Sequence, residues 1–255
     1  IGLMDALGFD TVDLVGASMG GFIAQSVAIQ APERLRSLTL IMTSTGSRRV
    51  GHPTPRVARQ LLARRSMRTR EEAVAAAVQV FTLIGSPGFA LDEEYLEQRA
   101  GASYDRGYDP KGYLRQLAAV LSQPDRTRKL KALDVPTLVV HGLHDPLVSS
   151  TGGLALAKTI PGSRFVGYSG MGHDLPRELW QPLAQEIAWV SDEGIGSNAK
   201  KVMSRKGTFV TTLRFLDPID PAEPGDRKRL AVRAREAVGA ALGRADSAFE
   251  AGGDP

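Results

Sequence analysis

Four short runs of aliphatic and β-branched residues limit the fold of this chain more than any other feature of its sequence. The runs show no alternation of polar and apolar side chains, which is typical of strands that are covered on both faces. Helical patterns follow the first, third and fourth runs, and this order predicts a parallel sheet of the α/β class. The expected strands are residues 12–15, 38–42, 137–141 and 164–168, and the expected helices are residues 22–30, 153–159 and 175–190.

Residues 43–133 interrupt this order, because they contain helical patterns but no strand pattern. The segments "GSPGF" and "DRGYDP" contain turn residues and separate the helical stretches from one another. A helical block of this size between two strands of a sheet predicts a cap. The expected cap helices are residues 54–66, 70–84, 92–100 and 110–121.

The composition removes several classes of function. The 255 residues include no cysteine, which excludes a thiolate nucleophile, a cysteine-ligated zinc site and a disulfide, and favours a reducing, cytoplasmic location. No apolar run approaches the about 20 residues that span a bilayer, so we expect no membrane span. The net charge of +4 is spread along the chain, which indicates a solvated surface rather than a nucleic-acid-binding one.

A single serine stands in "GASMG", residues 16–20, directly after the first expected strand. This is the G-x-S-x-G pattern, and it lies between a strand and a helix, as a nucleophile of this kind requires. We expect Ser18 to occupy a strained turn that lifts its hydroxyl clear of the sheet, while Gly16 and Gly20 let strand and helix approach closely. The Met19 backbone N–H would then face a developing oxyanion.

A serine nucleophile needs a base, and the base needs an acid that orients it. Among four histidines, His173 is the candidate base, because "SGMGHDLP" follows the last strand and carboxyl ends of parallel strands meet at one edge. The other three are interpreted as structural. His52 lies in an exposed connector, His141 ends a strand as a packed or hydrogen-bonded scaffold residue, and His144 shapes a turn.

The candidate acid is Asp145, which follows the third strand in "HGLHDPLV". Two alternatives stay open. Asp174 is a rival acid, although a side chain adjacent in sequence to the base usually points away from it, and Asp145 alone also fits a turn residue or a helix cap. The order Ser, Asp, His at the carboxyl ends of separate strands favours Ser18, Asp145 and His173 acting together.

Three of these motifs, "GASMGG", "VVHGLHDPLV" and "GMGHDLP", together resemble the α/β-hydrolase superfamily over residues 1–190. The segments "IMTSTG" and "ASYDRGYDP" resemble its aclacinomycin methylesterase-like and haloperoxidase-like esterase branch. The resemblance implies Ser18 as nucleophile, Asp145 as orienting acid, His173 as general base and the Met19 amide as one oxyanion donor. It implies no cofactor and no metal. Ser18 argues against the dehalogenase and epoxide-hydrolase relatives, which need an aspartate at that position.

Members of the superfamily have about four strands before the strand that leads to the nucleophile, and a His-Gly loop in that region supplies a second oxyanion donor. The present sequence begins one helix before the strand that leads to Ser18. We therefore expect a truncated α/β-hydrolase fold with impaired activity, comprising a mostly parallel sheet, an inserted helical cap and a short C-terminal extension. The expected boundaries are residues 1–194 for the partial hydrolase domain, with the cap at about 43–133, and 195–255 for an extension of unknown role. The extension includes a strand pattern, "TFVTTLRFL", and a basic helix pattern at residues 227–242.

The expected function is hydrolysis of a small-molecule carboxylic ester through an acyl-enzyme, with the methyl ester of a bulky ring system as the suggested substrate. Aromatic cap residues are candidates for the substrate pocket. They are Phe81, Phe89, Tyr104 and Tyr108. Cofactor-free perhydrolysis and a non-catalytic binding or scaffold role are the alternatives, and the sequence does not set the oligomeric state.

Overall fold

The structure is a computed structural model that describes residues 1–62, 67 and 69–188. The chain divides into two compact units, and one of them includes residues Ile1–Thr11 with the short helix α1 (Gly2–Ala6). The sheet and the cap belong to the other unit, which begins at Val12. The strand and helix patterns expected within the C-terminal extension lie outside the described residues.

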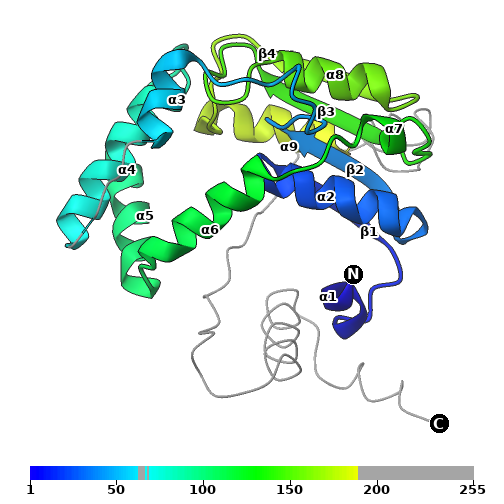
Figure 1. Cartoon of the computed structure of the whole chain (residues 1–255), viewed down its shortest axis with the longest axis horizontal. Helices are drawn as coiled ribbons and strands as arrows, with labels where there is room; N and C mark the ends of the chain where they lie inside the picture. The colour runs from blue at the N-terminus through cyan, green and yellow to red at the C-terminus, as the bar shows by residue number, and fades with distance from the viewer. Residues whose placement is uncertain (63–66, 68, 189–255) are drawn as a thin grey trace, which may run out of the picture. The chain divides into compact units, whose positions relative to one another are not determined.

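Within the described residues, four parallel strands form one sheet in the order β1-β2-β3-β4 (Figure 1). Each contains an expected strand core, although β2 begins three residues earlier than the sequence pattern indicated. The strands are β1 (Val12–Ala17), β2 (Leu35–Ile41), β3 (Thr137–Gly142) and β4 (Arg164–Tyr168). Parallel pairing brings the carboxyl ends of all four to one edge of the sheet, which is where α/β folds place their ligands.

Two hydrophobic clusters lie against the sheet, and alternate residues of its strands contribute to each. Leu38 and Leu40 join one cluster together with helices α2 (Met19–Gln30), α7 (Thr127–Leu130) and α8 (Thr151–Thr159). Ile41 and residues of β3 join the other, with α9 (Trp180–Ala188) and the preceding 3-10 helix η2 (Arg177–Leu179). A further 3-10 helix, η1 (Pro32–Arg34), leads into β2.

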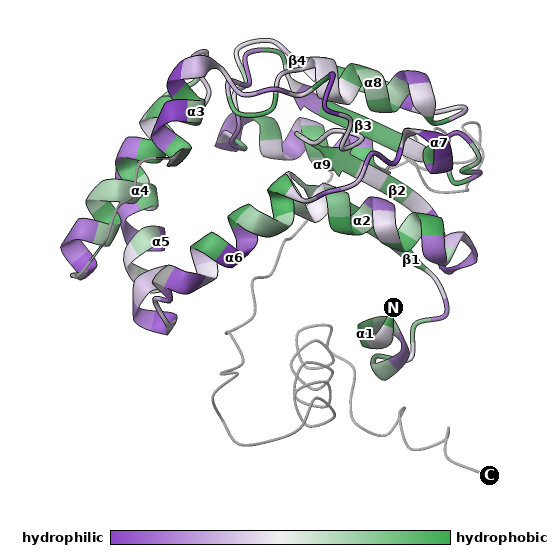
Figure 2. Ribbon diagram, in the orientation of Figure 1, coloured by the Kyte–Doolittle hydropathy of each residue, from purple (hydrophilic) through white to green (hydrophobic). Residues whose placement is uncertain are grey.

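Burial along the strands confirms the sequence pattern for the middle of the sheet and corrects it for the edge. Every residue of β3 and all but one of β2 are buried, because both faces of these strands are covered. The edge strand β1 instead alternates, with Asp13 exposed and Val15 exposed to 46%. The prediction of coverage on both faces is therefore wrong for β1, in which Val12 and Leu14 pack against a cluster while Asp13 and Val15 are exposed, and for β4, in which no residue is fully buried. Figure 2 shows mostly apolar colouring on β3 and a mixture of apolar and polar colouring along the cap helices.

Between β2 and β3 the structure describes helices and no strand, which confirms the inserted helical block (Figure 1). Side chains at Thr69, Asp92 and Asp109 accept backbone hydrogen bonds at three helix starts, which explains why these helices begin there. The cap helices are α3 (Pro55–Leu62), α4 (Arg70–Ile84), α5 (Glu93–Arg106) and α6 (Pro110–Leu121). Helix α5 runs six residues further than expected, and Gly107, with φ 146°, follows its end.

Candidate active site

The turn between β1 and α2 has the strained geometry that the serine motif predicts. Ser18 has φ 53° and ψ −118°, a left-handed backbone that residues other than glycine rarely adopt. Its amide donates to the Ile41 carbonyl at 2.8 Å, and its carbonyl accepts from the Gly21 amide at 2.9 Å. Such strain persists only where the surroundings hold it, so neighbouring strand and helix together fix the position of the serine.

Close packing around this turn depends on Gly16 and Gly21. A Cβ atom on Gly16 would lie 2.4 Å from the Gly20 carbonyl oxygen and 2.7 Å from the Cβ of Ala24. A Cβ atom on Gly21 would lie 2.5 Å from the side chain of Thr43, whereas one on Gly20 would meet nothing within 4 Å. The expectation for Gly16 is confirmed. The expectation for Gly20 is wrong, because the close approach falls on Gly21.

His173 lies in the loop after β4 and connects the other two candidate residues. Its Nε2 is 2.9 Å from the Ser18 Oγ, and its Nδ1 is 2.7 Å from the Asp145 Oδ2. His173 and Asp145 are both buried, at 8% and 7% exposure, whereas Ser18 is half-buried. The three side chains thus form one continuous line of hydrogen-bonding distances that ends at a partly accessible hydroxyl.

The Asp145 carboxylate is fixed from two sides. Its Oδ1 accepts from the Leu147 amide at 2.9 Å and the Val148 amide at 2.8 Å, which leaves Oδ2 to face His173. The turn role that the sequence left open for Asp145 is therefore present, and it is the means by which the carboxylate is aimed. The rival Asp174 binds the Ser86 hydroxyl with its Oδ1.

The remaining three histidines have different surroundings, and their structural role stays a prediction. His141 is fully buried, and its Nε2 is 2.8 Å from the Val148 carbonyl and 3.6 Å from the Asp145 carboxylate. Burial lowers the pKa of His141 below its ordinary value, so the neutral ring donates Nε2–H to that carbonyl. His144 is exposed and accepts the Gly170 amide at 3.0 Å, and His52 is exposed.

Met19 begins α2 directly after the serine, so its amide is one of the free donors of the first helical turn. A donor at that place is suited to an oxyanion that forms on a group bound to Ser18. The geometry thus places Met19 where its expected role requires, and the role remains a prediction.

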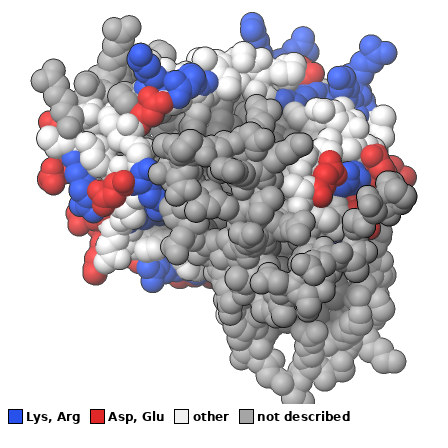
Figure 3. All heavy atoms as spheres, turned by 90° about the horizontal axis from the view of Figure 1, so that it is seen from below, with Lys and Arg blue, Asp and Glu red and all other residues white. Residues whose placement is uncertain are grey.

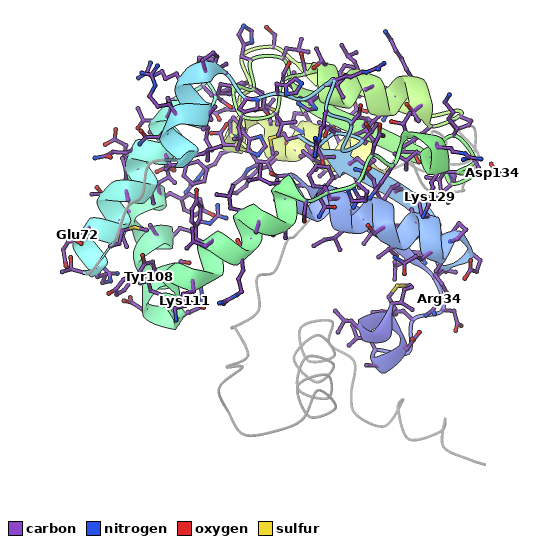
Figure 4. All side chains as sticks on the ribbon, in the orientation of Figure 1. Arg34, Glu72, Tyr108, Lys111, Lys129 and Asp134 are labelled. Carbon is purple, nitrogen blue, oxygen red and sulfur yellow. The ribbon has the colours of Figure 1, made fainter. Side chains whose placement is uncertain are left out.

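The four aromatic cap residues do not share one location. Phe81 lines a pocket of about 330 Å³ with His144 and Ser86, while Phe89 packs against the sheet cluster that contains Met171. Tyr104 and Tyr108 stack on each other with ring centroids 5.3 Å apart. Figure 4 labels Tyr108 at the end of the cap where α5 passes into α6. The structure gives these residues three different surroundings, and their role in substrate binding stays a prediction.

Sequence reasoning missed the cap residues that contact the His173 loop. The Ile84 carbonyl accepts the His173 amide at 2.7 Å, and the Ser86 hydroxyl accepts the Gly172 amide at 2.8 Å. The only signal at this place was "GSPGF", which indicated a break between helices and no contact 86 residues away in sequence.

Two kinds of site are absent from the part of the chain that the structure describes. No group of three or more histidine, aspartate or glutamate side chains there is arranged to hold a metal ion. None of its helices combines the length and the apolar character that a bilayer crossing requires. On the face shown in Figure 3, basic and acidic side chains are interspersed over the described surface.

The α/β hydrolase fold family model matches residues 2–176, which is more than half of the chain. The chain belongs to the α/β hydrolase fold family. A 2-hydroxy-6-oxononadienedioate/2-hydroxy-6-oxononatrienedioate hydrolase from Pseudomonas putida is 30% identical over 173 residues, covering 68% of this chain and 59% of that protein. A rhodomycin D methylesterase from Streptomyces peucetius is 26% identical over 206 residues, covering 73% of this chain and 69% of that protein. Among solved structures, a thermophilic esterase from Thermogutta terrifontis matches with a TM-score of 0.52 and 26% identity, covering 73% of this chain and 66% of that one.

These relatives share the hydrolase fold and differ in the chemistry that their names record. The family membership, the parallel sheet and the helical insertion agree with the expectations from sequence. The chain spans about three fifths of the length of the first curated relatives that it matches.

Proposed function

We propose that this member of the α/β hydrolase family cleaves carboxylic esters, with Ser18 as nucleophile, His173 as general base and Asp145 as the acid that orients it. The observation that carries the proposal is the pair of distances at His173, 2.9 Å to the serine hydroxyl and 2.7 Å to the carboxylate. A base so placed reaches the proton that it must remove, and its tautomer is set by the acid.

In the proposed first half-reaction, the Ser18 Oγ bonds to the ester carbonyl carbon while its proton moves to the His173 Nε2. The carbonyl electron pair moves onto oxygen, and the Met19 amide donates to that oxyanion. When the pair returns, the bond from carbon to the alkoxy oxygen breaks, and His173 gives its proton to the leaving alcohol. The acyl group stays on Ser18.

In the second half-reaction, His173 removes a proton from water as the water oxygen attacks the acyl carbon. Collapse of the second oxyanion breaks the bond to Ser18 and releases the acid, and His173 returns the proton to the serine. Asp145 stabilises the protonated imidazole in both halves without taking up the proton itself.

The esterase names among the relatives support an ester as substrate, and the rhodomycin D methylesterases support a methyl ester on a large ring system. The 2-hydroxy-6-oxononadienedioate hydrolases carry a second candidate, hydrolysis of a carbon–carbon bond next to a ketone. The two reactions differ in the leaving group. Parallel assays with the methyl ester of an aromatic ring compound and with a vinylogous 1,5-diketone therefore distinguish ester hydrolysis from carbon–carbon bond hydrolysis.

A fluorophosphonate probe tests the serine itself, because only an activated hydroxyl reacts rapidly with it. We expect the folded chain to be labelled at Ser18 and Ser18→Ala to lose both labelling and p-nitrophenyl butyrate hydrolysis, the latter by about 10³-fold or more. Ser122→Ala is the matched control, because that hydroxyl is exposed on the cap and bonds only to the Ala119 carbonyl among the contacts described. A folded chain that the probe leaves unlabelled at Ser18 would support the scaffold alternative instead.

A further inference from the structure

The cap segment after α4 lies directly against the loop that carries His173. Four hydrogen bonds join the two segments, and two of them run between main-chain atoms. The His173 amide donates to the Ile84 carbonyl at 2.7 Å, and the Gly88 amide donates to the Gly170 carbonyl at 2.9 Å. The third runs from the Gly172 amide to the Ser86 hydroxyl at 2.8 Å. The cap is thus bonded to the candidate base's own main chain.

The Ser86 hydroxyl connects both neighbours of His173. Since its oxygen accepts the Gly172 amide, its own hydrogen is free for the Asp174 Oδ1, with which it pairs. A single side chain from the cap therefore holds the residue before the histidine through the main chain and the residue after it through the carboxylate. Asp174 thus bonds to the Ser86 hydroxyl and not to the His173 imidazole among the contacts described.

Packing between the two segments is backbone against backbone. A Cβ atom on Gly172 would lie 2.1 Å from the Gly85 carbonyl oxygen, and one on Gly88 would lie 2.6 Å from the Gly170 Cα. Main-chain atoms at such distances do not yield as a flexible side chain does. The main chain on either side of His173 therefore lies directly against the cap, and Ser86 bonds to the residue on each side of the histidine within this contact.

We propose that Ser86 and Asp174 form a positioning pair, through which the cap sets the place of the His173 imidazole relative to Ser18. This inference rests on the proposed role of His173 as base. The pair acts through the main chain on either side of the histidine. Its loss shifts the ring from the 2.9 Å distance to the serine hydroxyl, and a displacement of about 1 Å at a catalytic group lowers the rate by about 10²-fold.

The test compares variants that remove the pair with variants that keep its hydrogen bonds. Ser86→Ala and Asp174→Ala remove it, whereas Ser86→Thr keeps a hydroxyl and Asp174→Asn keeps an acceptor. With p-nitrophenyl butyrate, we expect the two alanine variants to lower kcat by about 10- to 100-fold and to change KM by less than about threefold. We expect the two conservative variants to stay within about threefold of the parent kcat.

Arg177→Gln is the matched control, because it also removes a contact between cap and core. Arg177 pairs with Asp92 at 3.0 Å and lies over the ring of Tyr95, away from the base loop's own bonds. We expect it to lower the melting temperature with kcat within about threefold of the parent. If Arg177→Gln lowers kcat as much as Ser86→Ala, the effect comes from cap docking in general, and the inference is overturned.

Fluorophosphonate labelling separates failure of this inference from failure of the proposed function. A parent chain that labels at Ser18, with Ser86→Ala labelling about tenfold or more slowly, supports the pair. Equal labelling rates in parent and Ser86→Ala overturn the pair and leave the serine mechanism standing. A folded parent chain without labelling overturns both.

Discussion

Replacing Asp145 by asparagine changes one atom of the candidate site, and the surrounding hydrogen bonds determine the result. The Oδ1 position accepts two backbone amides, from Leu147 and Val148, and only an oxygen can occupy it without losing both bonds. In Asp145→Asn the amide oxygen therefore takes that place, and the NH2 group faces the Nδ1 of His173. That nitrogen must then accept, which leaves the ring proton on Nε2, pointing at the Ser18 hydroxyl. A ring in this tautomer cannot remove the serine proton.

The hydrogen bonds of the Asp145 side chain also determine how much of the Asp145→Asn variant has His173 in the productive tautomer. To restore the productive tautomer the asparagine must flip, which leaves two part-buried amide donors without an acceptor at about 1–3 kcal/mol each. The total of about 2–6 kcal/mol corresponds to a productive population lower by about 30- to 10⁴-fold. The lost carboxylate charge no longer stabilises the protonated imidazole, so we expect kcat to fall by about 10³- to 10⁴-fold.

The assay is p-nitrophenyl butyrate turnover, with thermal unfolding as the check that the variant is folded. Asp174→Asn is the control, because its amide oxygen still accepts from Ser86, and we expect its kcat within about threefold of the parent. A folded Asp145→Asn chain that keeps more than about a tenth of the parent activity refutes the reasoning. A larger loss in Asp174→Asn than in Asp145→Asn exchanges the two assignments.

Two further predictions concern stability. Gly16→Ala places a Cβ against the Gly20 carbonyl oxygen and Ala24, so we expect unfolding free energy to fall by about 1–3 kcal/mol in urea titrations, while Gly20→Ala, which meets nothing, stays neutral or gains up to about 1 kcal/mol. Equal losses in both would contradict the packing argument. Burial lowers the pKa of His141 in the folded chain, so between that lowered pKa and the ordinary value of about 6.5 the ring is protonated in the unfolded chain and neutral in the folded chain. The contribution to stability is therefore complete above pH about 6.5 and decreases as the pH falls toward the lowered pKa. We expect His141→Gln to reduce the dependence of stability on pH, measured by thermal unfolding at a series of pH values. An unchanged dependence would mean that other groups cause it.

The positions of the sheet and the candidate triad could be predicted from sequence because each depends on a local pattern. Runs such as Thr137–Gly142 are apolar throughout, since both faces of a central strand are buried. Ser18 follows β1 directly, whereas Asp145 and His173 lie in the loops after β3 and β4. Parallel strands bring their carboxyl ends, and therefore these three positions, to one edge of the sheet. The topology therefore converts three separated motifs into one site.

Features that depend on contacts between distant segments could not be predicted in the same way. The apolar run of β1 resembles that of a strand covered on both faces, yet Val15 is 46% exposed, because only the face with Val12 and Leu14 packs against a hydrophobic cluster. The choice of Gly21 over Gly20 depends on where Thr43 lies, and Thr43 belongs to another strand's end. The burial of β1 and the close contact at Gly21 both depend on residues that are distant in the sequence.

The Ser86 contact is the strongest example, and it changes how the cap is understood. The sequence predicts a cap that covers the site and contacts substrate through aromatic side chains such as Phe81. In the structure the segment after α4 instead bonds to the main chain of His173 and its neighbours. Substitutions in the cap would then alter the rate through the base as well as affinity through the pocket, because the same segment borders both. A variant series across residues 81–89 that separates kcat from KM is the measurement that distinguishes these two effects.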